Sequence, residues 1–435
     1  MTTYQNSLAG LPKALRIESD APVRSLRRNF QWTIVGNAVY ACTQWGILVL
    51  LAHLGDAAAV GRFSLGLAIT APMMLFAGLS LRAVQATDAR REFLLADYAG
   101  LRLLMVAIAL SAIVSIAFCG YSGETAAIIA LFGVSKSIES LSDLLYGFWQ
   151  QHERLELIAK SLILRGLLAI ILGAAAYAAT HATWAAVLGI TAAWALVFIA
   201  FDLKHAIILA QQTGQSLRPC VSLDHMKKLA KLALPLGLVA MLVSLNANIP
   251  RYAISHFQSM REVGTYSALS YVHMAGTMVV VALSQAASPR LAIYASRNHS
   301  REYRKLFSQM LLVGLVLAIF VVSAATLFGR QILLVLYGSE YASSDQLFVW
   351  LSAAAGITFV ASFVGTGLTS ARHFRIQLPL FLSITAINVA LCFFWVRSDG
   401  LMGAAKALTV VAAIQLIATM AALAWLEGRR LAATS

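Results

Sequence analysis

The chain has 435 residues, of which 60% are hydrophobic and only 12% are charged, and its mean hydropathy is +0.76. This composition excludes the soluble classes of protein, which cover their cores with many more charged residues. The formal net charge of +14 does not indicate a nucleic-acid partner, because the basic residues are spread between apolar segments and form no separate basic domain.

Twelve apolar segments are each long enough to cross a bilayer as a helix, which takes about 20 residues. They lie near 30–54, 62–81, 99–119, 125–149, 157–179, 183–203, 232–255, 264–287, 306–328, 346–370, 376–396 and 400–426. The sequence therefore predicts an all-α polytopic membrane protein with about 12 transmembrane helices. The expected divisions are a tail (1–28), a six-helix bundle (29–203), a linker (204–231), a second six-helix bundle (232–428) and a tail (429–435).

The basic residues fix the expected orientation. With the N-terminus assigned to the cytoplasm, 25 of the 33 Lys and Arg residues fall on the cytoplasmic side, 4 in outer loops and 4 within spans. This asymmetry follows the positive-inside rule. It predicts a multi-pass protein of the bacterial inner (cytoplasmic) membrane with both termini in the cytoplasm. The four cysteines are not placed for a periplasmic disulfide, and the scattered histidines predict no metal or cofactor.

The two halves of the chain each contain a similar short segment. Val60-Gly61-Arg62-Phe63-Ser64 opens the second span, and Val263-Gly264-Thr265-Tyr266-Ser267 opens the eighth. Both segments run inward from the outer side, so they predict a parallel repeat, which is a known transporter architecture. Between the halves, residues 224–232 form a basic amphipathic segment, interpreted either as a helix along the inner leaflet or as a simple linker helix.

Span four carries three charged residues, Lys136, Glu139 and Asp143, on one helix face. Each costs about 2.5–3.5 kcal/mol at the bilayer centre, so this face is expected to meet protein or a water-filled cavity. Arg165 in span five is the expected partner of the excess carboxylate. The four residues are interpreted either as a buried ion network that joins helices or as a proton-responsive relay.

Arg251 differs from these charges because no acidic residue is close to it in the sequence. Pro250 frees a backbone carbonyl beside it, and Asn246 and Asn248 add amide groups. An intramembrane arginine beside amides is what an anionic, polyhydroxylated ligand requires, since the guanidinium can hold a phosphate. The alternative is that Arg251 lies near the outer surface and snorkels.

Several other polar residues are weaker candidates for a substrate path. Lys406 in span twelve either lines the same cavity or snorkels outward. Arg82 and Arg290, at the equivalent inner ends of spans two and eight, either ring a cytoplasmic mouth or anchor the topology. Asn37 and Gln44 make span one unusually polar, and their amides are expected to face a lumen.

Several short phrases of the sequence, spread over about residues 25 to 427, together resemble a known family. The chain is similar to the polysaccharide transporters of the multidrug/oligosaccharidyl-lipid/polysaccharide flippase superfamily, in particular the O-antigen and exopolysaccharide repeat-unit flippases. The phrases are Leu81-Arg82 through Thr87-Asp88, Asp97-Tyr98 and Arg102, Lys136 through Tyr146-Gly147, Leu234-Pro235-Leu236-Gly237, Asn248-Ile249-Pro250-Arg251-Tyr252, Ser288-Pro289-Arg290-Leu291 and Tyr337-Gly338-Ser339-Glu340-Tyr341.

The resemblance implies two six-helix bundles around a central cavity and movement of an undecaprenyl-pyrophosphate-linked oligosaccharide from the inner to the outer leaflet by alternating access. Arg251 would then bind the pyrophosphate or an acidic sugar, with Asn246 and Asn248 on sugar hydroxyls. A polysaccharide polymerase and a chain-length regulator are implied partners, no nucleic acid is expected, and the protein is not expected to be an enzyme.

Three other functions remain open at this stage. A cation-coupled drug or solute antiporter of the same fold is disfavoured because span one carries no acidic residue, although Glu139 and Asp143 could serve instead. A polytopic polysaccharide polymerase or ligase is disfavoured because no large external loop is present. A scaffold for glycosyltransferases would act through the cytoplasmic loops at 203–231 and 288–305. No ATP-binding motif occurs, so a driving force would be an ion gradient, substrate flux or a partner.

Overall fold

The computed structural model describes residues 26–88, 92–220, 222–296, 300–370 and 374–434. The predicted N-terminal tail falls mostly on residues 1–25, which lie outside the described residues. The described residues are almost entirely helical, which confirms the predicted class of all-α membrane protein. The helices of the first half are α1 (Leu26–Leu54), α2 (Ala57–Gly78), α3 (Leu81–Thr87), α4 (Leu95–Gly120), α5 (Gly123–Gln151), α6 (Leu155–Thr180), α7 (Thr183–Val197) and α8 (Lys204–Thr213).

The second half is helical as well. Its helices are α9 (Leu223–Phe257), α10 (Met260–Tyr271), α11 (Met274–Ser296), α12 (Ser300–Tyr337), α13 (Ser339–Ala342), α14 (Asp345–Ser370) and α15 (Phe374–Thr434). Gly400 divides α15 into two arms, because its φ of 57° lies in the left-handed region that glycine adopts without a Cβ clash.

The number of membrane crossings is consistent with the expected twelve. Within the described residues, nine helices are long and apolar enough to cross a bilayer, and α10 with α11, bent by 44°, makes a tenth. The 29-residue α5 is also long enough, but its charged residues lower its hydropathy. The helix α15 is one of the nine, and the break at Gly400 divides it into two arms, which adds one further crossing.

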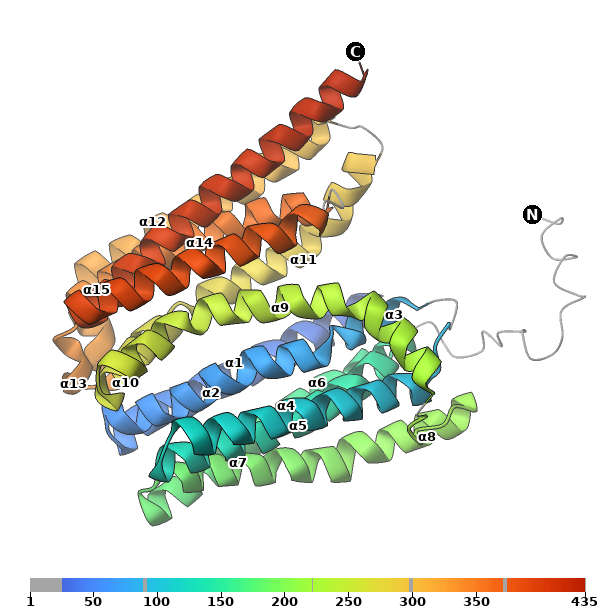
Figure 1. The fold of residues 1–435 in the computed structure, drawn as a ribbon, viewed down its shortest axis with the longest axis horizontal. Coiled ribbons are helices and arrows are strands. Elements are labelled where there is room, and N and C mark those ends of the chain that lie inside the picture. The colour runs from blue at the N-terminus through green and yellow to red at the C-terminus, as the bar shows by residue number, and fades with distance from the viewer. Residues whose placement is uncertain (1–25, 89–91, 221, 297–299, 371–373, 435) are drawn as a thin grey trace, which may run out of the picture.

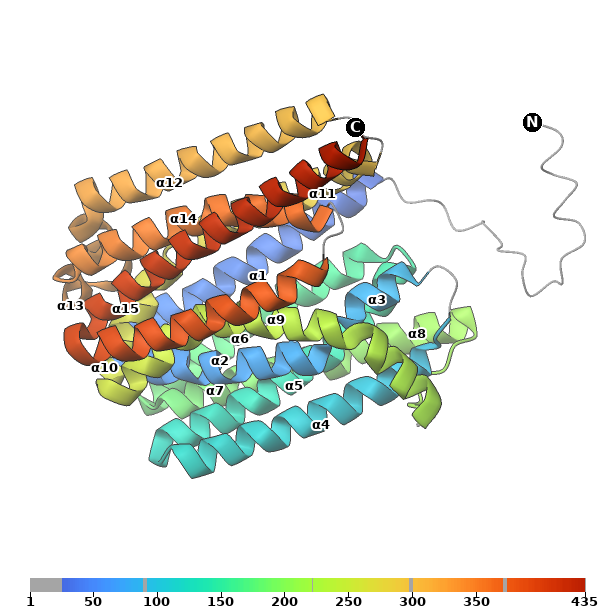
Figure 2. The same ribbon diagram turned by 45° about the horizontal axis from the view of Figure 1, so that its top comes forward.

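Following the predicted division, we name α1–α8 the N-terminal bundle and α9–α15 the C-terminal bundle. Within the first, α6 packs on α1 and α7, and α5 on α2, α4 and α7; within the second, α14 packs on α12 and α15, and α15 on α9. In Figure 1 the helices α12, α14 and α15 diverge from α1 and α2 toward the end where the chain terminates at α15. Figure 2 shows that α1 begins at this same end, which we name the predicted cytoplasmic end.

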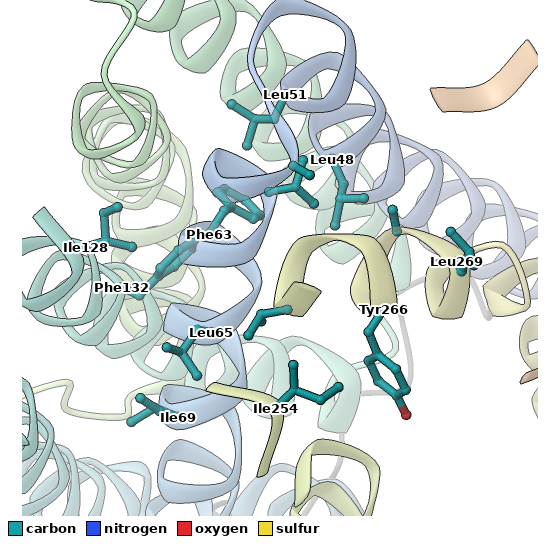
Figure 3. Packing of buried hydrophobic residues seen from close by; sticks show 14 of the residues in the cluster. Leu48, Leu51, Phe63, Leu65, Ile69, Ile128, Phe132, Ile254, Tyr266 and Leu269 are labelled. Carbon is teal, nitrogen blue, oxygen red and sulfur yellow. The ribbon is translucent and has the colours of Figure 1, made fainter. Parts of the chain in front are cut away.

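The bundles meet along α9, whose beginning packs on α4, and at the opposite, predicted outer end. There α2 and α9 pack together and α10 packs on α2. A single cluster of buried apolar side chains continues from one bundle to the other, and Figure 3 shows part of it. Phe63 of α2 meets Phe132 of α5 edge to face at 4.9 Å, while Ile254 and Tyr266 belong to the other bundle.

The predicted amphipathic segment 224–232 is the beginning of α9 and continues into the seventh span without a break. Its apolar residues, Met226 and Leu229, are buried in a cluster with Tyr98 and Leu101 of α4. Its lysines are exposed. The segment is therefore held to α4 on one side and presents its charges on the other.

Candidate functional site

Arg251 lies in α9, two turns before the helix ends at Phe257 at the predicted outer end. Its side chain is half-buried and held by three hydrogen bonds. The Nε donates to the Ser267 hydroxyl of α10 at 3.0 Å. The Nη1 donates to the carbonyl of Ala247 at 3.1 Å and to the side-chain oxygen of Asn248 at 2.9 Å. These acceptors are all neutral, so the charge of Arg251 is not compensated by them.

Two aromatic rings complete the surroundings of Arg251. The guanidinium carbon lies 5.8 Å from the ring centre of Tyr266 and 5.6 Å from that of Tyr271. Such cation–π contacts attract the guanidinium without neutralising its charge. A guanidinium has five N–H donors, and those on Nε and Nη1 are engaged, which leaves the two on Nη2. No carboxylate in the described part of the chain pairs with Arg251, and a single nitrogen is thus available to an anionic ligand.

The two asparagines expected beside Arg251 face different neighbours. Asn248 contacts Arg251, as the sequence predicts. Asn246 instead donates to the Thr385 hydroxyl at 2.8 Å, and its backbone carbonyl accepts from Asn388 at 2.9 Å. Asn246 therefore joins α9 to α15 within the C-terminal bundle, and its proposed contact with sugar hydroxyls would require those bonds to be exchanged.

The remaining candidate residues are not gathered around Arg251. Lys406 pairs with Asp399 at 3.0 Å beside the break at Gly400, and its side chain is 39% exposed. Arg290 is exposed on α11 toward the predicted cytoplasmic end. On α1, Asn37 is exposed and donates to the Thr33 carbonyl at 2.8 Å, whereas the buried Nε2 of Gln44 has no hydrogen-bond partner. Their roles in a substrate path stay predictions.

The first part of the predicted charge network in α5 joins two neighbouring helices. Lys136 pairs with Glu139 at 2.6 Å, and Glu139 also accepts a hydrogen bond from the Tyr40 hydroxyl of α1 at 2.9 Å. The Lys136 ammonium lies 5.3 Å from the ring centre of Trp194 in α7. This arrangement places the pair between α1 and α7, with both charges satisfied.

Asp143 is bridged by two arginines from different elements. Arg82 of α3 approaches it at 3.4 Å, and Arg102 of α4 approaches its other oxygen at 3.3 Å. Arg82 also donates to the Gln150 side chain at 3.1 Å, and the buried Arg102 donates to Ser140 at 3.0 Å. Arg82 is therefore tied to α5 in the N-terminal bundle, and its role at a cytoplasmic mouth or as a topology anchor stays a prediction.

The expected partner of Arg165 was wrong. Arg165 pairs with Asp202 at 3.1 Å, with both side chains fully buried, rather than with a carboxylate of α5. The Ser142 hydroxyl accepts from the same guanidinium, whose carbon lies 5.5 Å from the ring centre of Trp194. Asp202 stands in a π-helical turn, Phe198–Leu203, between α7 and α8. The extra residue in such a turn changes the direction of the side chains that follow, so an α-helical register misplaces Asp202.

Sequence reasoning thus missed two residues that contact the candidate residues. Asp202 could have been identified from the sequence, because a carboxylate within an apolar segment requires a buried cation as its partner. Ser267, the acceptor from Arg251, had only the weaker signal that it belongs to the repeated segment. No group of three or more His, Cys, Asp and Glu side chains that could ligate a metal occurs in the part of the chain that the structure describes.

Comparison with known sequences shows that the chain is similar to proteins of polysaccharide biosynthesis. A family model described as polysaccharide biosynthesis protein matches residues 26–295. Among curated proteins, the capsular polysaccharide biosynthesis protein CapF of Staphylococcus aureus is 25% identical over 392 residues, which covers 90% of this chain and 97% of CapF.

Comparison with solved structures identifies the fold. A multidrug resistance MATE family transporter of the MOP superfamily, in an inward-facing conformation, has a TM-score of 0.72 and 14% identity, over 91% of this chain and 99% of the other. The lipid II flippase MurJ, in an inward closed conformation, has a TM-score of 0.71 and 12% identity, over 91% and 87% of the two chains. At these identities the likeness is one of fold alone.

Proposed function

Because the chain belongs to the polysaccharide biosynthesis protein family, which confirms the predicted resemblance to polysaccharide transporters, we propose that it moves a lipid-linked oligosaccharide across the membrane. The family and the fold support flipping or transport of lipid-linked saccharides in general. In the specific form, an undecaprenyl-pyrophosphate-linked repeat unit passes from the inner to the outer leaflet of the bacterial cytoplasmic membrane by alternating access. No chemical bond of the substrate changes, so the protein is a transporter rather than an enzyme.

The observation that best supports this proposal is that Arg251 has no carboxylate partner among the described residues. Of the four cations expected within the spans, Lys136, Arg165 and Lys406 pair with carboxylates. Arg251 is bound instead by a hydroxyl, a carbonyl and an amide oxygen. An uncompensated cation within the membrane is costly, and an anionic ligand that supplies the missing charge removes that cost. The site therefore favours an anionic headgroup over a cationic drug.

The chemistry of the headgroup follows from the donors that Arg251 retains. Its Nη2 offers two N–H groups to one or two phosphate oxygens, which are stronger acceptors than neutral oxygens. The nearby Tyr266 and Tyr271 rings offer apolar faces of the kind on which a sugar ring packs. A pyrophosphate joined to an oligosaccharide supplies both partners, and the polyprenyl chain remains in the bilayer outside the bundles.

The test uses a deletion strain of the native host, in which lipid-linked saccharides are extracted and assigned to a leaflet by their accessibility to an impermeant modifying reagent. We expect a complete repeat unit to accumulate on the cytoplasmic side, and expression of the wild-type chain to restore its appearance on the outer side. Complete units on the outer face of the deletion strain would contradict the proposal. Such a result together with retained cationic drugs would favour an antiporter, and altered chain length alone would favour a polymerase.

A further inference from the structure

The helices α2 and α10 touch backbone to backbone at the predicted outer end. A Cβ atom built on Gly61 would overlap the carbonyl oxygen of Met260, and one built on Gly264 would overlap the carbonyl oxygen of Ala57. The same positions lie 3.0 Å from the backbone nitrogen of Gly264 and 2.9 Å from that of Gly61, respectively. No residue larger than glycine fits at either place while the helices remain at this separation.

The contact has the symmetry of the sequence repeat. Gly61 and Gly264 are the second residues of the repeated segments, and Ala57 and Met260 each precede their glycine by four residues, about one helical turn. Each glycine meets the carbonyl at the equivalent position of the other helix. The repeat is thus explained physically, since two equivalent helices can cross this closely only if both carry glycine at the crossing.

Each of the two helices also has an ion pair within its own bundle. Arg62 of α2 pairs with Glu124 of α5 at 3.1 Å. Arg261 of α10 pairs with Glu340 of α13 at 3.0 Å. No hydrogen bond or ion pair joins α2 to α10 within the described ranges. The crossing therefore depends on close packing, and each helix keeps an ion pair in its own bundle when the two part.

Hydrogen bonds between the bundles also join this end. Among them, the Tyr252 hydroxyl of α9 donates to the carbonyl of Ala68 in α2, and the Trp45 indole of α1 donates to the Tyr337 hydroxyl of α12 at 3.0 Å. Both are side-chain bonds that water replaces when the bundles separate, at a net cost of about 0.5–1.5 kcal/mol each. Close backbone packing at the glycines, together with the apolar cluster that the bundles share, keeps this end closed.

We propose that Gly61 and Gly264 form the outer gate, as a pair of positioning residues whose contact closes this end and whose separation opens it. A methyl group at either position keeps α2 and α10 apart and holds the chain with its outer end open. The proposal rests on the proposed function only in taking the two bundles to alternate between two arrangements, and its test contains no saccharide.

The experiment measures the distance between the bundles at the predicted outer end by pulsed electron paramagnetic resonance. The full chain, with its four native cysteines replaced, carries spin labels on Thr180→Cys of α6 and Ser398→Cys of α15, which are both exposed. We expect Gly61→Ala and Gly264→Ala each to shift the distance distribution to longer values in lipid nanodiscs. Gly120→Ala is the matched control, because a Cβ there meets no atom within 4 Å, and it should leave the distribution unchanged.

Three results would overturn the proposal. Unchanged distances in both glycine variants would mean that the crossing does not set the separation of the bundles. A shift in one variant alone would contradict the symmetric pairing. Loss of folded protein in the glycine variants, with the control normal, would make the crossing part of a permanent core rather than a gate. If the distances shift as expected but the deletion strain exports normally, the gate stands and the proposed substrate fails.

Discussion

The N-terminal bundle pairs both of its intramembrane cations with carboxylates, whereas the C-terminal bundle does so for only one of its two. There Lys406 pairs with Asp399, and Arg251 has no carboxylate partner among the described residues. In the first, the intramembrane cation Arg165 pairs with the buried Asp202, and Lys136 pairs with Glu139. In the second, Arg251 is bound only by neutral oxygens and aromatic rings. The paired cations can stabilise helix packing but have little charge left for a ligand. The charge of Arg251 has no carboxylate partner among the described residues, and under the proposed function it is available to an anionic ligand.

This difference also separates two expectations for mutation. Removal of one member of a buried pair leaves an uncompensated charge in a medium of low dielectric, which damages folding before it affects transport. Removal of Arg251 leaves only neutral groups behind, so folding should survive while binding is lost. Variants in the two bundles should therefore divide into those that reduce the amount of folded protein and those that reduce transport.

The largest effect is expected at the fully buried pair of Arg165 and Asp202. Arg165→Leu strands the carboxylate of Asp202 and should lower the stability by about 3–5 kcal/mol, the usual cost of breaking a buried ion pair. The measurement is the thermal unfolding of purified protein in detergent, together with its abundance in the membrane. The double variant Arg165→Leu, Asp202→Leu is the control and should recover much of the loss, because no buried charge remains. A single variant as stable as the wild type would contradict the structural interpretation of this pair.

The next effect concerns transport rather than folding. Arg251→Ala removes the cation from the site and should abolish export of the lipid-linked saccharide, while the unfolding temperature stays close to that of the wild type. Arg251→Lys keeps the charge but loses the planar fork that contacts Ser267 and Asn248, so we expect partial export. The leaflet assay of the deletion strain, complemented by each variant, provides the measurement.

Normal export by Arg251→Ala at wild-type abundance would remove the central support of the proposed function. Equal loss of folded protein in Arg251→Ala and Arg165→Leu would instead erase the difference between the two bundles, since Arg251 would then be a packing residue as well.

Spacing along the chain predicted contacts within one helix and failed for contacts between helices. Lys136 and Glu139, three residues apart, form the expected pair. The partner of Arg165 could not be read in this way, because Asp202 is 37 residues away and reaches it from a π-helical turn. Likewise Asp143 is shared by Arg82 and Arg102, which come from two other helices. Ion pairs in a bundle depend on which helices are neighbours, and hydropathy does not specify that.

The asparagines near Arg251 illustrate a further limit that the sequence itself could have indicated. Asn246 and Asn248 are two positions apart, which places them about 200° apart around an α-helix, so they cannot face the same ligand. Asn248 and Arg251 are three apart and share a face, and they are in contact. The repeat of Gly61 and Gly264 was visible in the sequence, but its reason required the crossing of α2 and α10.

The smallest effect is expected at Lys406, the other cation that the sequence places within a span of the C-terminal bundle. Its pair with Asp399 is partly exposed on both sides, 39% and 46%, and such pairs contribute about 0–1 kcal/mol to stability. Lys406→Gln should therefore leave both the unfolding temperature and the export of saccharide close to the wild type. The same leaflet assay makes it the matched control for Arg251→Ala, because each variant removes one cation from the same bundle. Blocked export by Lys406→Gln at normal abundance would mean that a cation with a carboxylate partner can still take part in binding. The substrate path would then have to extend to the break at Gly400.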